Sequence, residues 1–342
     1  MTAIHEGLDL AALQRFLTDS GIAVRGELRA ELISGGKSNL TYGILDEVSH
    51  WVLRRPPTAG LTPSAHDVAR EFRITSALKG SGVPVAPTVV QCEDDSVMGA
   101  PFTLVEYVEG RVVRSKDDLD ALADDEIDRC IGELVRILAD LHNVDFEAVG
   151  LGGLGRPDGY VTRQVRLWAS QWSRVKTREL PDLERLHAAL ADSIPDSPAP
   201  AIVHGDYRID NTILDTSDTG RVVAVVDWEL STLGDPLTDL AMMCVYRHPA
   251  LDDILGFPAA WTSERLPSND DLVQRYAAAS DRDIANWNFY MGLAYLKLAV
   301  IAEGINHRWR AGATIGDGFD RAGEAVPALV SAGLAALKGT HT

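Results

Sequence analysis

The most constraining feature of the sequence is a polar pattern set between apolar segments in residues 201–228. The apolar segment 201–203 runs into His204-Gly205-Asp206, and Asn211 follows five residues after Asp206. A second apolar segment, VVAVV, ends in Asp227, sixteen residues after Asn211. Short apolar runs bounded by turn residues predict buried strands, so we expect a hairpin that gathers the three polar side chains at one end.

These three side chains suit phosphoryl transfer. That chemistry needs a group that positions an attacking hydroxyl and a cation, chiefly Mg²⁺, that neutralises phosphate charge. Mg²⁺ takes one or two protein oxygens beside phosphate and water, which Asn211 and Asp227 can provide. Asp206 can accept the hydroxyl proton. A single Asp or Asn at a strand end is more often a turn former, but the ordered set of three favours a functional site.

Two glycine-rich patterns fail as nucleotide sites. Gly36-Lys37-Ser38 resembles the end of a P-loop, but Glu31 stands where that loop requires glycine, and a strand follows instead of a helix. Residues 150–155 match G-x-G-x-x-G, yet a helical pattern precedes them and Pro157 follows. The sequence contains no G-x-S-x-G, H-E-x-x-H or C-x-x-C motif, which leaves hydrolase and zinc sites unsupported.

The chain divides by pattern into a β-rich part and a helical part. A short amphipathic helix at 8–20 precedes strand patterns at 30–34, 39–45 and 50–55, and an inserted helix at 64–80 precedes two further strands. Long helical patterns begin near residue 117. We therefore predict a two-lobed α+β fold, with a small antiparallel sheet and one inserted helix in residues 1–108, a hinge at 106–111, and a larger, mainly helical lobe in residues 112–342.

Charge and composition exclude more than they identify. The formal net charge of −18 disfavours nucleic acid and anionic membranes as partners. Three separated cysteines and an acidic amino terminus without a signal-peptide pattern favour a cytoplasmic protein. The apolar stretch 291–305 is interrupted by Lys297 and Glu303, so we expect a buried helix there and not a membrane span.

The motif residues also resemble a known family. The sequence HGDYRIDN at 204–211, with Val226-Asp227-Trp228-Glu229, resembles the catalytic and metal loops of the aminoglycoside phosphotransferase and choline-kinase-like family. The segment DWELSTLGDPLTDLA at 227–241 is similar to a kinase-like branch that is fused to acyl-CoA dehydrogenases in animals. The resemblance covers about residues 25–310. It implies a protein-kinase-like fold, use of ATP and Mg²⁺, Asp206 as catalytic base, and Asn211 and Asp227 as metal ligands.

The resemblance implies roles for further positions. Arg54 falls where kinases place a phosphate-binding lysine, with Arg55 as a rival, and Glu71 matches the glutamate that pairs with this cation. The loop that would cover the ATP phosphates contains Ser34, Gly35, Gly36, Ser38 and Asn39, and the hinge whose backbone would bind adenine contains Glu106, Tyr107 and Val108. We expect His142 to be a packed or capping histidine, and Asp235 and Asp239 to brace the catalytic loops.

The sequence thus predicts an ATP- and Mg²⁺-dependent kinase that phosphorylates a hydroxyl of a small molecule. The alternatives are a non-catalytic nucleotide-binding module and a true aminoglycoside kinase. Aromatic residues in 160–174 and 284–310, where Glu303 is the single acid of the second segment, favour a partly apolar acceptor over a polycationic antibiotic. Core packing would explain the same aromatic residues equally well. They are Trp168, Trp172, Trp287, Phe289, Tyr290, Tyr295 and Trp309, with Arg163 and Arg166 beside the first two.

Overall fold

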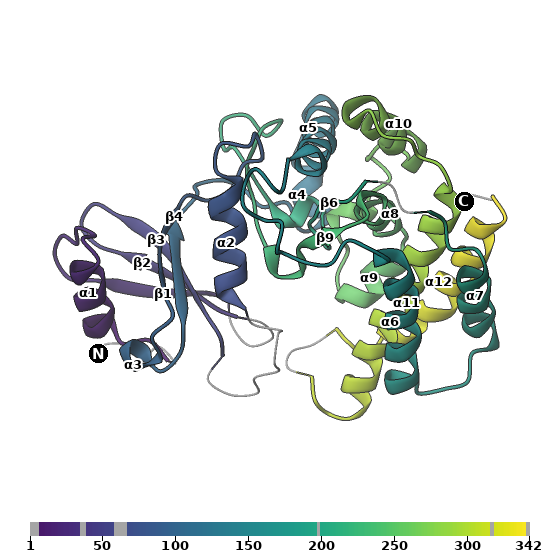
Figure 1. The fold of residues 1–342 in the computed structure, drawn as a ribbon, viewed down its shortest axis with the longest axis horizontal. Helices are drawn as coiled ribbons and strands as arrows, with labels where there is room; N and C mark the ends of the chain where they lie inside the picture. Colours follow the sequence, from purple (N-terminus) through teal and green to yellow (C-terminus); the bar gives the residue numbers. More distant parts are fainter. Residues whose placement is uncertain (1–6, 35–38, 58–66, 197–198, 315–317, 340–342) are drawn as a thin grey trace. The chain divides into compact units, whose positions relative to one another are not determined.

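The computed structural model describes residues 7–34, 39–57, 67–196, 199–314 and 318–339. It divides into two compact units: Met1–Gly80, Pro84–Glu109 and Ala224–Glu229 form the first, and Ser81–Val83, Gly110–Val223 and Leu230–Thr342 form the second. The first unit contains a five-stranded antiparallel sheet and the second is mainly helical, which confirms the predicted α+β, kinase-like fold class (Figure 1). In the part of the chain that is described, no helix combines the length and apolar character needed to cross a membrane.

The sheet of the first unit has the strand order β1-β2-β3-β5-β4, with antiparallel pairing throughout. The β2–β3 register pairs Leu40 with Arg55 and Leu45 with His50, so residues 46–49 form the turn between them. The bounds of the first three strands agree with the predicted ranges 30–34, 39–45 and 50–55 to within one residue at each end. The five strands are β1 Arg29–Ser34, β2 Leu40–Leu45, β3 His50–Arg55, β4 Thr88–Cys92 and β5 Phe102–Glu106.

Three helices accompany this sheet: α1 Leu10–Asp19, α2 Val68–Leu78 and α3 Asp95–Met98. Leu13 and Leu17 of α1 pack into the same core as Phe102 and Leu104 of β5, and α1 and α3 lie side by side (Figure 1). The expected single inserted helix is α2, which begins at Val68 and not at 64; residues 64–66 lie outside the described residues. The expectation missed the short α3, although Asp94 accepts a hydrogen bond from Ser96 N and left-handed Gly99 ends the helix.

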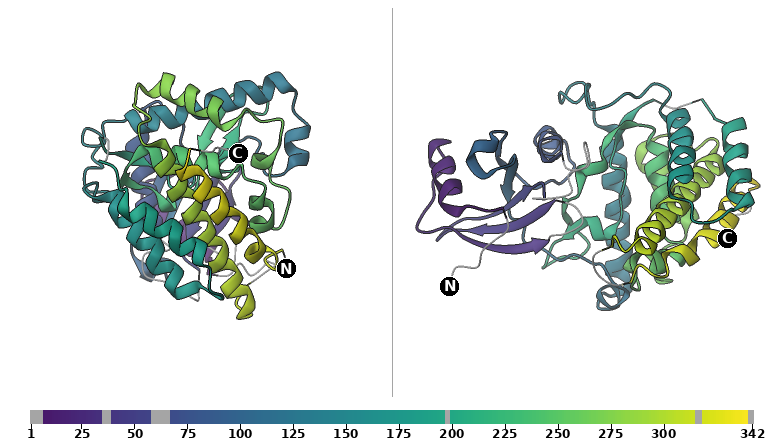
Figure 2. Two further views of the ribbon diagram at one scale, coloured as in Figure 1. Left: turned by 90° about the vertical axis from the view of Figure 1, so that its right-hand side faces the viewer. Right: turned by 90° about the horizontal axis from the view of Figure 1, so that it is seen from below.

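The second unit is built around long helices with buried apolar faces. The sequence-predicted buried helix is α11, Trp287–Arg310, which packs along α12, α8 and α6 (Figure 2). The other helices described in this unit are α4 Lys116–Asp120, α5 Asp124–Asn143, α6 Tyr160–Val175, α7 Pro181–Asp192, α8 Pro236–Val245, α9 Ala250–Leu255, α10 Asn269–Ser280 and α12 Ala322–Leu337.

Short strands in the middle of the chain carry the predicted motif. β6 Ala201–Val203 pairs antiparallel with β9 Thr232–Gly234, and β7 Thr212–Leu214 pairs with β8 Val222–Val225. Single 3-10 turns, η1 Ile209–Asn211 and η2 Trp228–Leu230, follow the two halves of the motif, and a third, η3, covers Ala260–Thr262. The predicted hairpin strands are therefore present.

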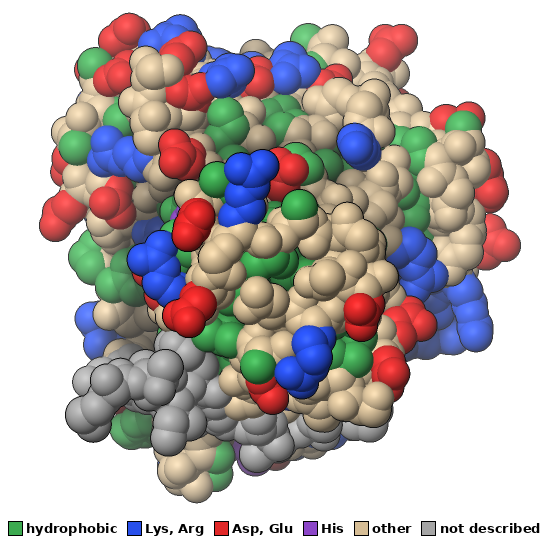
Figure 3. Space-filling model, turned by 90° about the vertical axis from the view of Figure 1, so that its left-hand side faces the viewer, with side chains coloured by type: hydrophobic (Ala, Val, Ile, Leu, Met, Phe, Trp, Pro, Cys, Tyr) green, Lys and Arg blue, Asp and Glu red, His purple; other side chains and the backbone are tan. Residues whose placement is uncertain are grey.

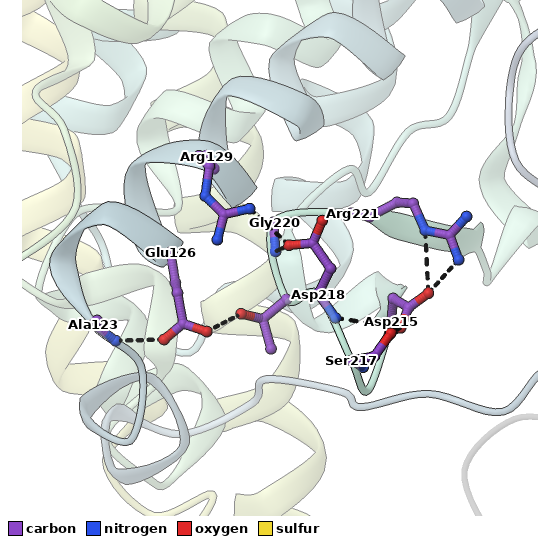
Figure 4. Close-up of polar contacts among 9 residues, drawn as sticks. Ala123, Glu126, Arg129, Asp215, Ser217, Asp218, Gly220 and Arg221 are labelled. Atoms are coloured by element: carbon purple, nitrogen blue, oxygen red, sulfur yellow. Dashed lines mark hydrogen bonds and ion pairs between the residues drawn. The ribbon is translucent and has the colours of Figure 1, made fainter.

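The turn between β7 and β8 is tied to the amino-terminal end of α5 (Figure 4). Thr219 Oγ1 donates to Glu126 at 2.7 Å, Arg129 Nη1 donates to Asp218 at 2.7 Å, and Arg221 pairs with Asp215 inside the turn. The acids of this turn therefore already have protein donors, and the contacts fix the connection between the two halves of the motif.

Acidic and basic side chains are interspersed on the face that Figure 3 draws, and they do not form one acidic field. The net charge of −18 is consequently a property of the whole chain and gives no evidence about one particular site.

Glu303, considered from the sequence as an acid of an acceptor pocket, instead satisfies a buried network. Its side chain is fully buried and accepts hydrogen bonds from Thr177 N at 2.8 Å, Thr177 Oγ1 at 2.7 Å and Arg178 Nη2 at 3.1 Å. A buried carboxylate is tolerated when donors surround it in this way. Glu303 therefore fixes the connection between α6 and α7 against α11.

We expect Glu303→Ala to lower the free energy of unfolding by about 3 kcal/mol, because it leaves the buried donors of Thr177 without their acceptor. Glu179→Ala is the matched control, since Glu179 is 75% exposed and pairs only with Lys176; its effect should stay within about 0.5 kcal/mol. Urea denaturation of both variants measures the difference, and equal effects would contradict the structural role of Glu303.

Candidate active site

Strand β6 leads directly into the segment that presents Asp206. Gly205 has a left-handed backbone (φ +89°), and a Cβ at this position would lie 2.9 Å from Leu230 Cβ and 3.0 Å from Leu230 O. Both the conformation and the close approach require glycine. The Asp239 carboxylate accepts hydrogen bonds from His204 N at 2.5 Å and Gly205 N at 2.8 Å. Asp239 thus fixes the backbone immediately before Asp206, as expected from the sequence.

Asp239 is itself held within a buried polar cluster. His142 Nε2 lies 3.4 Å from Asp239 Oδ2, and His142 Nδ1 lies 2.7 Å from the Tyr276 hydroxyl, so His142 is a packed histidine as predicted. Burial alone would raise the pKa of Asp239, but hydrogen bonds from His142 and His204 outweigh burial and lower it. Asp235 has a different role: it caps α8 through Leu237 N at 3.0 Å and accepts the Tyr290 hydroxyl of α11 at 2.7 Å.

The structure brings Asp206 and Asn211 into contact. Asn211 Nδ2 donates to the backbone carbonyl of Asp206 at 2.8 Å and to its carboxylate at 3.0 Å. The single turn η1 places the two side chains together. Because the side-chain nitrogen of Asn211 donates both of its hydrogen bonds to Asp206, the side-chain carbonyl oxygen of Asn211 is the atom available to a cation.

Arg208 and Tyr246 complete the surroundings of Asp206, and sequence reasoning assigned neither of them a role. Arg208 Nε lies 3.4 Å from Asp206 Oδ1, Nη1 lies 2.7 Å from Asp210 Oδ2, and the guanidinium carbon lies 5.3 Å from the centre of the Tyr246 ring. The Tyr246 hydroxyl donates to Asp206. Burial would raise the pKa of Asp206, but Arg208 and Tyr246 outweigh it and lower that pKa, so the carboxylate is ionised at neutral pH.

A second cluster lies within the first unit. Arg54 Nη1 forms an ion pair with Glu71 Oε2, Arg54 Nη2 lies 3.9 Å from Asp227 Oδ1, and Asn39 Nδ2 lies 3.4 Å from Glu71 Oε1. Arg55 instead donates to the carbonyl oxygen of Met98 at 3.0 Å and is buried. The geometry therefore separates the two rival arginines: Arg54 lies beside Glu71 and Asp227, and Arg55 fastens the chain to the end of α3.

Asp227 follows β8 in an unusual backbone conformation. Its φ is +67°, and Asp281 and Asn286 are the other non-glycine residues with positive φ in the described part of the chain. Such strain costs about 1–3 kcal/mol and is concentrated at functional sites. The side chain of Asp227 is 39% exposed, so its oxygens are accessible.

The donors fit Mg²⁺ better than a metal that needs a closed protein cage. No group of three or more His, Cys, Asp or Glu side chains suited to a metal ion occurs among the described residues. Mg²⁺ does not need one, since it keeps several waters and phosphate oxygens. Asn211 in the second unit and Asp227 in the first each offer a hard oxygen donor of the required kind.

The remaining predicted positions lie at strand ends. Glu106 N donates to Pro87 O at 2.8 Å and Tyr107 N donates to His50 O at 3.0 Å, while the Tyr107 ring stacks on His50. Of the three backbone N–H groups at 106–108, that of Val108 donates to no carbonyl oxygen of the described residues and is therefore available to a ligand. Ser34 ends β1, and Gly35, Gly36 and Ser38 lie outside the described residues.

Glu71 makes a pH dependence testable. Burial raises the pKa of Glu71 from 4.5 to about 7, although Arg54 opposes the shift. The folded protein therefore holds this proton more tightly than the unfolded chain, and the contribution of Glu71 to stability is lost as pH rises from 4.5 through about 7. We expect Glu71→Gln to lack this loss, so its stability relative to wild type should increase by about 3 kcal/mol between those pH values. Urea denaturation at a series of pH values measures it, and parallel curves would contradict the raised pKa.

Comparison with known proteins identifies the family. The model of the phosphotransferase enzyme family matches residues 29–286. Acyl-CoA dehydrogenase family member 10 of Mus musculus is 36% identical over 302 residues, which cover 87% of this chain but 28% of that protein, so the chain corresponds to a minor part of its length.

Two solved structures show the same fold. A candidate aminoglycoside phosphotransferase of Ralstonia eutropha is 32% identical, with a TM-score of 0.84 and coverage of 97% of this chain and 98% of the other. A thermostable aminoglycoside phosphotransferase APH(4)-Ia variant in complex with AMP-PNP and hygromycin B is 15% identical, with a TM-score of 0.61 and coverage of 94% and 98%. The resemblance noted in the sequence is confirmed, and the chain belongs to the phosphotransferase enzyme family.

Proposed function

We propose that this protein is an ATP- and Mg²⁺-dependent kinase that transfers the γ-phosphoryl group to a hydroxyl of a small molecule. The contact between Asp206 and Asn211 carries the proposal, because it holds an ionised carboxylate beside an amide whose oxygen remains for a cation. The AMP-PNP complex of the APH(4)-Ia neighbour supports nucleotide use by this fold.

Each residue of the site has a distinct task in this reaction. Asp206 orients the acceptor hydroxyl and takes its proton, while a bond forms from the acceptor oxygen to the γ-phosphorus and the bond from that phosphorus to the β–γ bridging oxygen breaks. ADP leaves, and the proton passes from Asp206 to solvent. The Asn211 carbonyl oxygen and the Asp227 carboxylate would hold Mg²⁺, which supplies positive charge to the phosphate oxygens when bound.

Arg54 takes the phosphate-binding task that most kinases give to a lysine. Its guanidinium can bind phosphate oxygens as a planar fork, and Glu71 keeps it oriented toward Asp227. The backbone at Val108 is available for adenine, as the hinge resemblance implies.

The acceptor that fits best is a hydroxylated, partly aliphatic molecule and not an aminoglycoside. A pocket in the second unit is lined by Trp168, Tyr290 and Leu293, beside Gly205 of the catalytic loop. The lining also contains polar groups, namely Gln164, Thr238, Asp239 and Lys297. Apolar walls with such polar groups suit a partly apolar ligand that carries polar atoms. The predicted acid Glu303 is buried elsewhere, and the names of the relatives connect the kinase-like region to acyl-CoA chemistry. A purely nucleotide-binding module is the weaker alternative, because it would not need an ionised Asp206.

A screen for acceptor-dependent ADP release tests the proposal directly. It should compare hydroxylated aliphatic metabolites with kanamycin-like compounds in the presence and absence of Mg²⁺. We expect turnover with the first group only. A kcat/KM for an aminoglycoside at or above about 10⁴ M⁻¹s⁻¹ would show the acceptor assignment to be wrong.

Asp206→Asn should lower kcat by about 10² to 10⁴, because it removes the base but keeps the shape of the side chain. Mg·ATP should still raise the melting temperature of this variant, whereas Asp227→Ala should lose much of that shift along with turnover. If Asp206→Asn keeps more than about a third of the wild-type kcat with chemistry rate-limiting, Asp206 is not the base.

Arg54→Met and Arg55→Met should differ in kind. We expect Arg54→Met to raise the KM for ATP about 10-fold or more with little change in stability, since its side chain is 23% exposed and lies beside Glu71 and Asp227. Arg55→Met should lower the melting temperature without a specific effect on ATP, because it loses the bond to the Met98 carbonyl. The reverse pattern would assign the phosphate-binding task to Arg55.

A further inference from the structure

A small pocket opens beside the catalytic loop within the second unit. It is bounded by Gly205, by Tyr160 and Trp168 of α6, and by Leu293 and Lys297 of α11. Its volume of about 20 Å³ accommodates a group little larger than one water molecule.

Lys297 provides the cation of this pocket. Its ammonium group donates one hydrogen bond, to the carbonyl oxygen of Gly205 at 3.0 Å, and lies 5.9 Å from the centre of the Trp168 ring. An ammonium has three N–H donors. Two of them therefore have no hydrogen-bond acceptor within the described chain and are left for solvent or a ligand.

The other ionisable groups of the lining do not neutralise this charge by direct contact. Asp239 also lines the pocket, but His204 N, Gly205 N and His142 occupy its carboxylate. Burial raises the pKa of Tyr160 well above its ordinary value, so that hydroxyl stays neutral. Lys297 is thus the one lining residue whose charged donors remain available.

The pocket also lies close to the reacting carboxylate. Gly205 immediately precedes Asp206. Burial lowers the pKa of Lys297, and the nearby carboxylates of Asp206 and Asp239 oppose that shift because they favour the charged ammonium. A ligand group that contacts Lys297 would therefore lie near the hydroxyl that Asp206 accepts. Lys297 repels a cationic ligand at the same place, because like charges in a partly buried site are strongly unfavourable.

We propose that Lys297 determines acceptor specificity by binding an anionic oxygen group, a carboxylate in the simplest case, carried by the hydroxylated acceptor. The two unused ammonium donors bind the carboxylate beside Trp168 and Tyr160, and the apolar body of the acceptor lies outside this small pocket. This inference rests on the proposed kinase function and adds the charge of the acceptor to it.

Matched acceptors test the inference. Short-chain hydroxycarboxylates and their primary amides share size and hydroxyl group but differ in charge. We expect wild type to prefer the carboxylates by about 10- to 100-fold in kcat/KM, the range expected of hydrogen bonds to a charged group. Lys297→Met should reduce the preference to within about threefold, and Lys297→Arg should retain part of it. Lys176→Met is the matched control, since it removes an equal charge from an ion pair with Glu179 at the surface.

A binding measurement separates failure of this inference from failure of the kinase proposal. The carboxylates should raise the melting temperature of wild type and Lys176→Met but not that of Lys297→Met, whether or not turnover occurs. Amides that bind and react as well as carboxylates would overturn the role of Lys297 while leaving the kinase intact. An equal loss for carboxylates and amides in Lys297→Met would show that Lys297 only supports the Gly205 backbone. Absence of any carboxylate-dependent shift would likewise overturn the inference.

Discussion

The buried carboxylate of Asp239 makes the hydrogen bonds on which the backbone of residues 204–206 depends. An anion that is 2% exposed is costly unless donors surround it, and the donors here include the backbone N–H groups of His204 and Gly205. The carboxylate of Asp239 therefore fixes backbone N–H groups as well as side chains. Gly205 can then take its left-handed conformation against Leu230, and Asp206 follows at the end of a fixed segment. Asp239 lies in α8, and Tyr246, the C-cap residue of the same helix, binds Asp206 through its hydroxyl, so this helix and its cap hold residues 204–206 at two places.

Two acidic residues in the protein show how partners decide the charge state of a buried acid. Burial raises the pKa of both Glu71 and Asp239 when taken alone. For Asp239, the hydrogen-bond donors around the carboxylate outweigh burial, so its pKa is lowered. For Glu71, burial raises the pKa more than the positive charge of Arg54 lowers it, and the negative charges of Asp227 and Glu229 raise it further. The charges of Asp227 and Glu229 thus act on the Arg54–Glu71 pair within the first unit, because they disfavour the ionised form of Glu71.

Sequence reasoning succeeded where the information is local. The first three strands, the inserted helix and the hairpin strands around the motif follow from adjacent residues, and the structure confirms these elements. It failed where the partners are far apart in the chain. Lys297 is separated from Gly205 by 92 residues, and its only signal was a charge that interrupts an apolar helix. No sequence pattern indicated the contact of Tyr246 with Asp206. Arg208 lies within the motif, two residues after Asp206, so its ion pair with Asp206 could have been predicted. The choice between Arg54 and Arg55 needed the pleat of β3, because alternate strand residues face opposite sides.

Helix α11 shows why the overall charge of a protein does not predict the charge of its site. Lys297 and Glu303 are six residues apart on this helix, and both interrupt an apolar run in the sequence. The carboxylate of Glu303 accepts hydrogen bonds from Thr177, Arg178 and Asn306, so its negative charge is satisfied inside the protein. Among the described residues Lys297 has one hydrogen-bond acceptor, Gly205 O, and its ammonium group keeps two further donors at a pocket beside Gly205. A chain of net charge −18 can therefore present a cation to its ligand, because a site is governed by the charges that remain without a partner in it and not by the total.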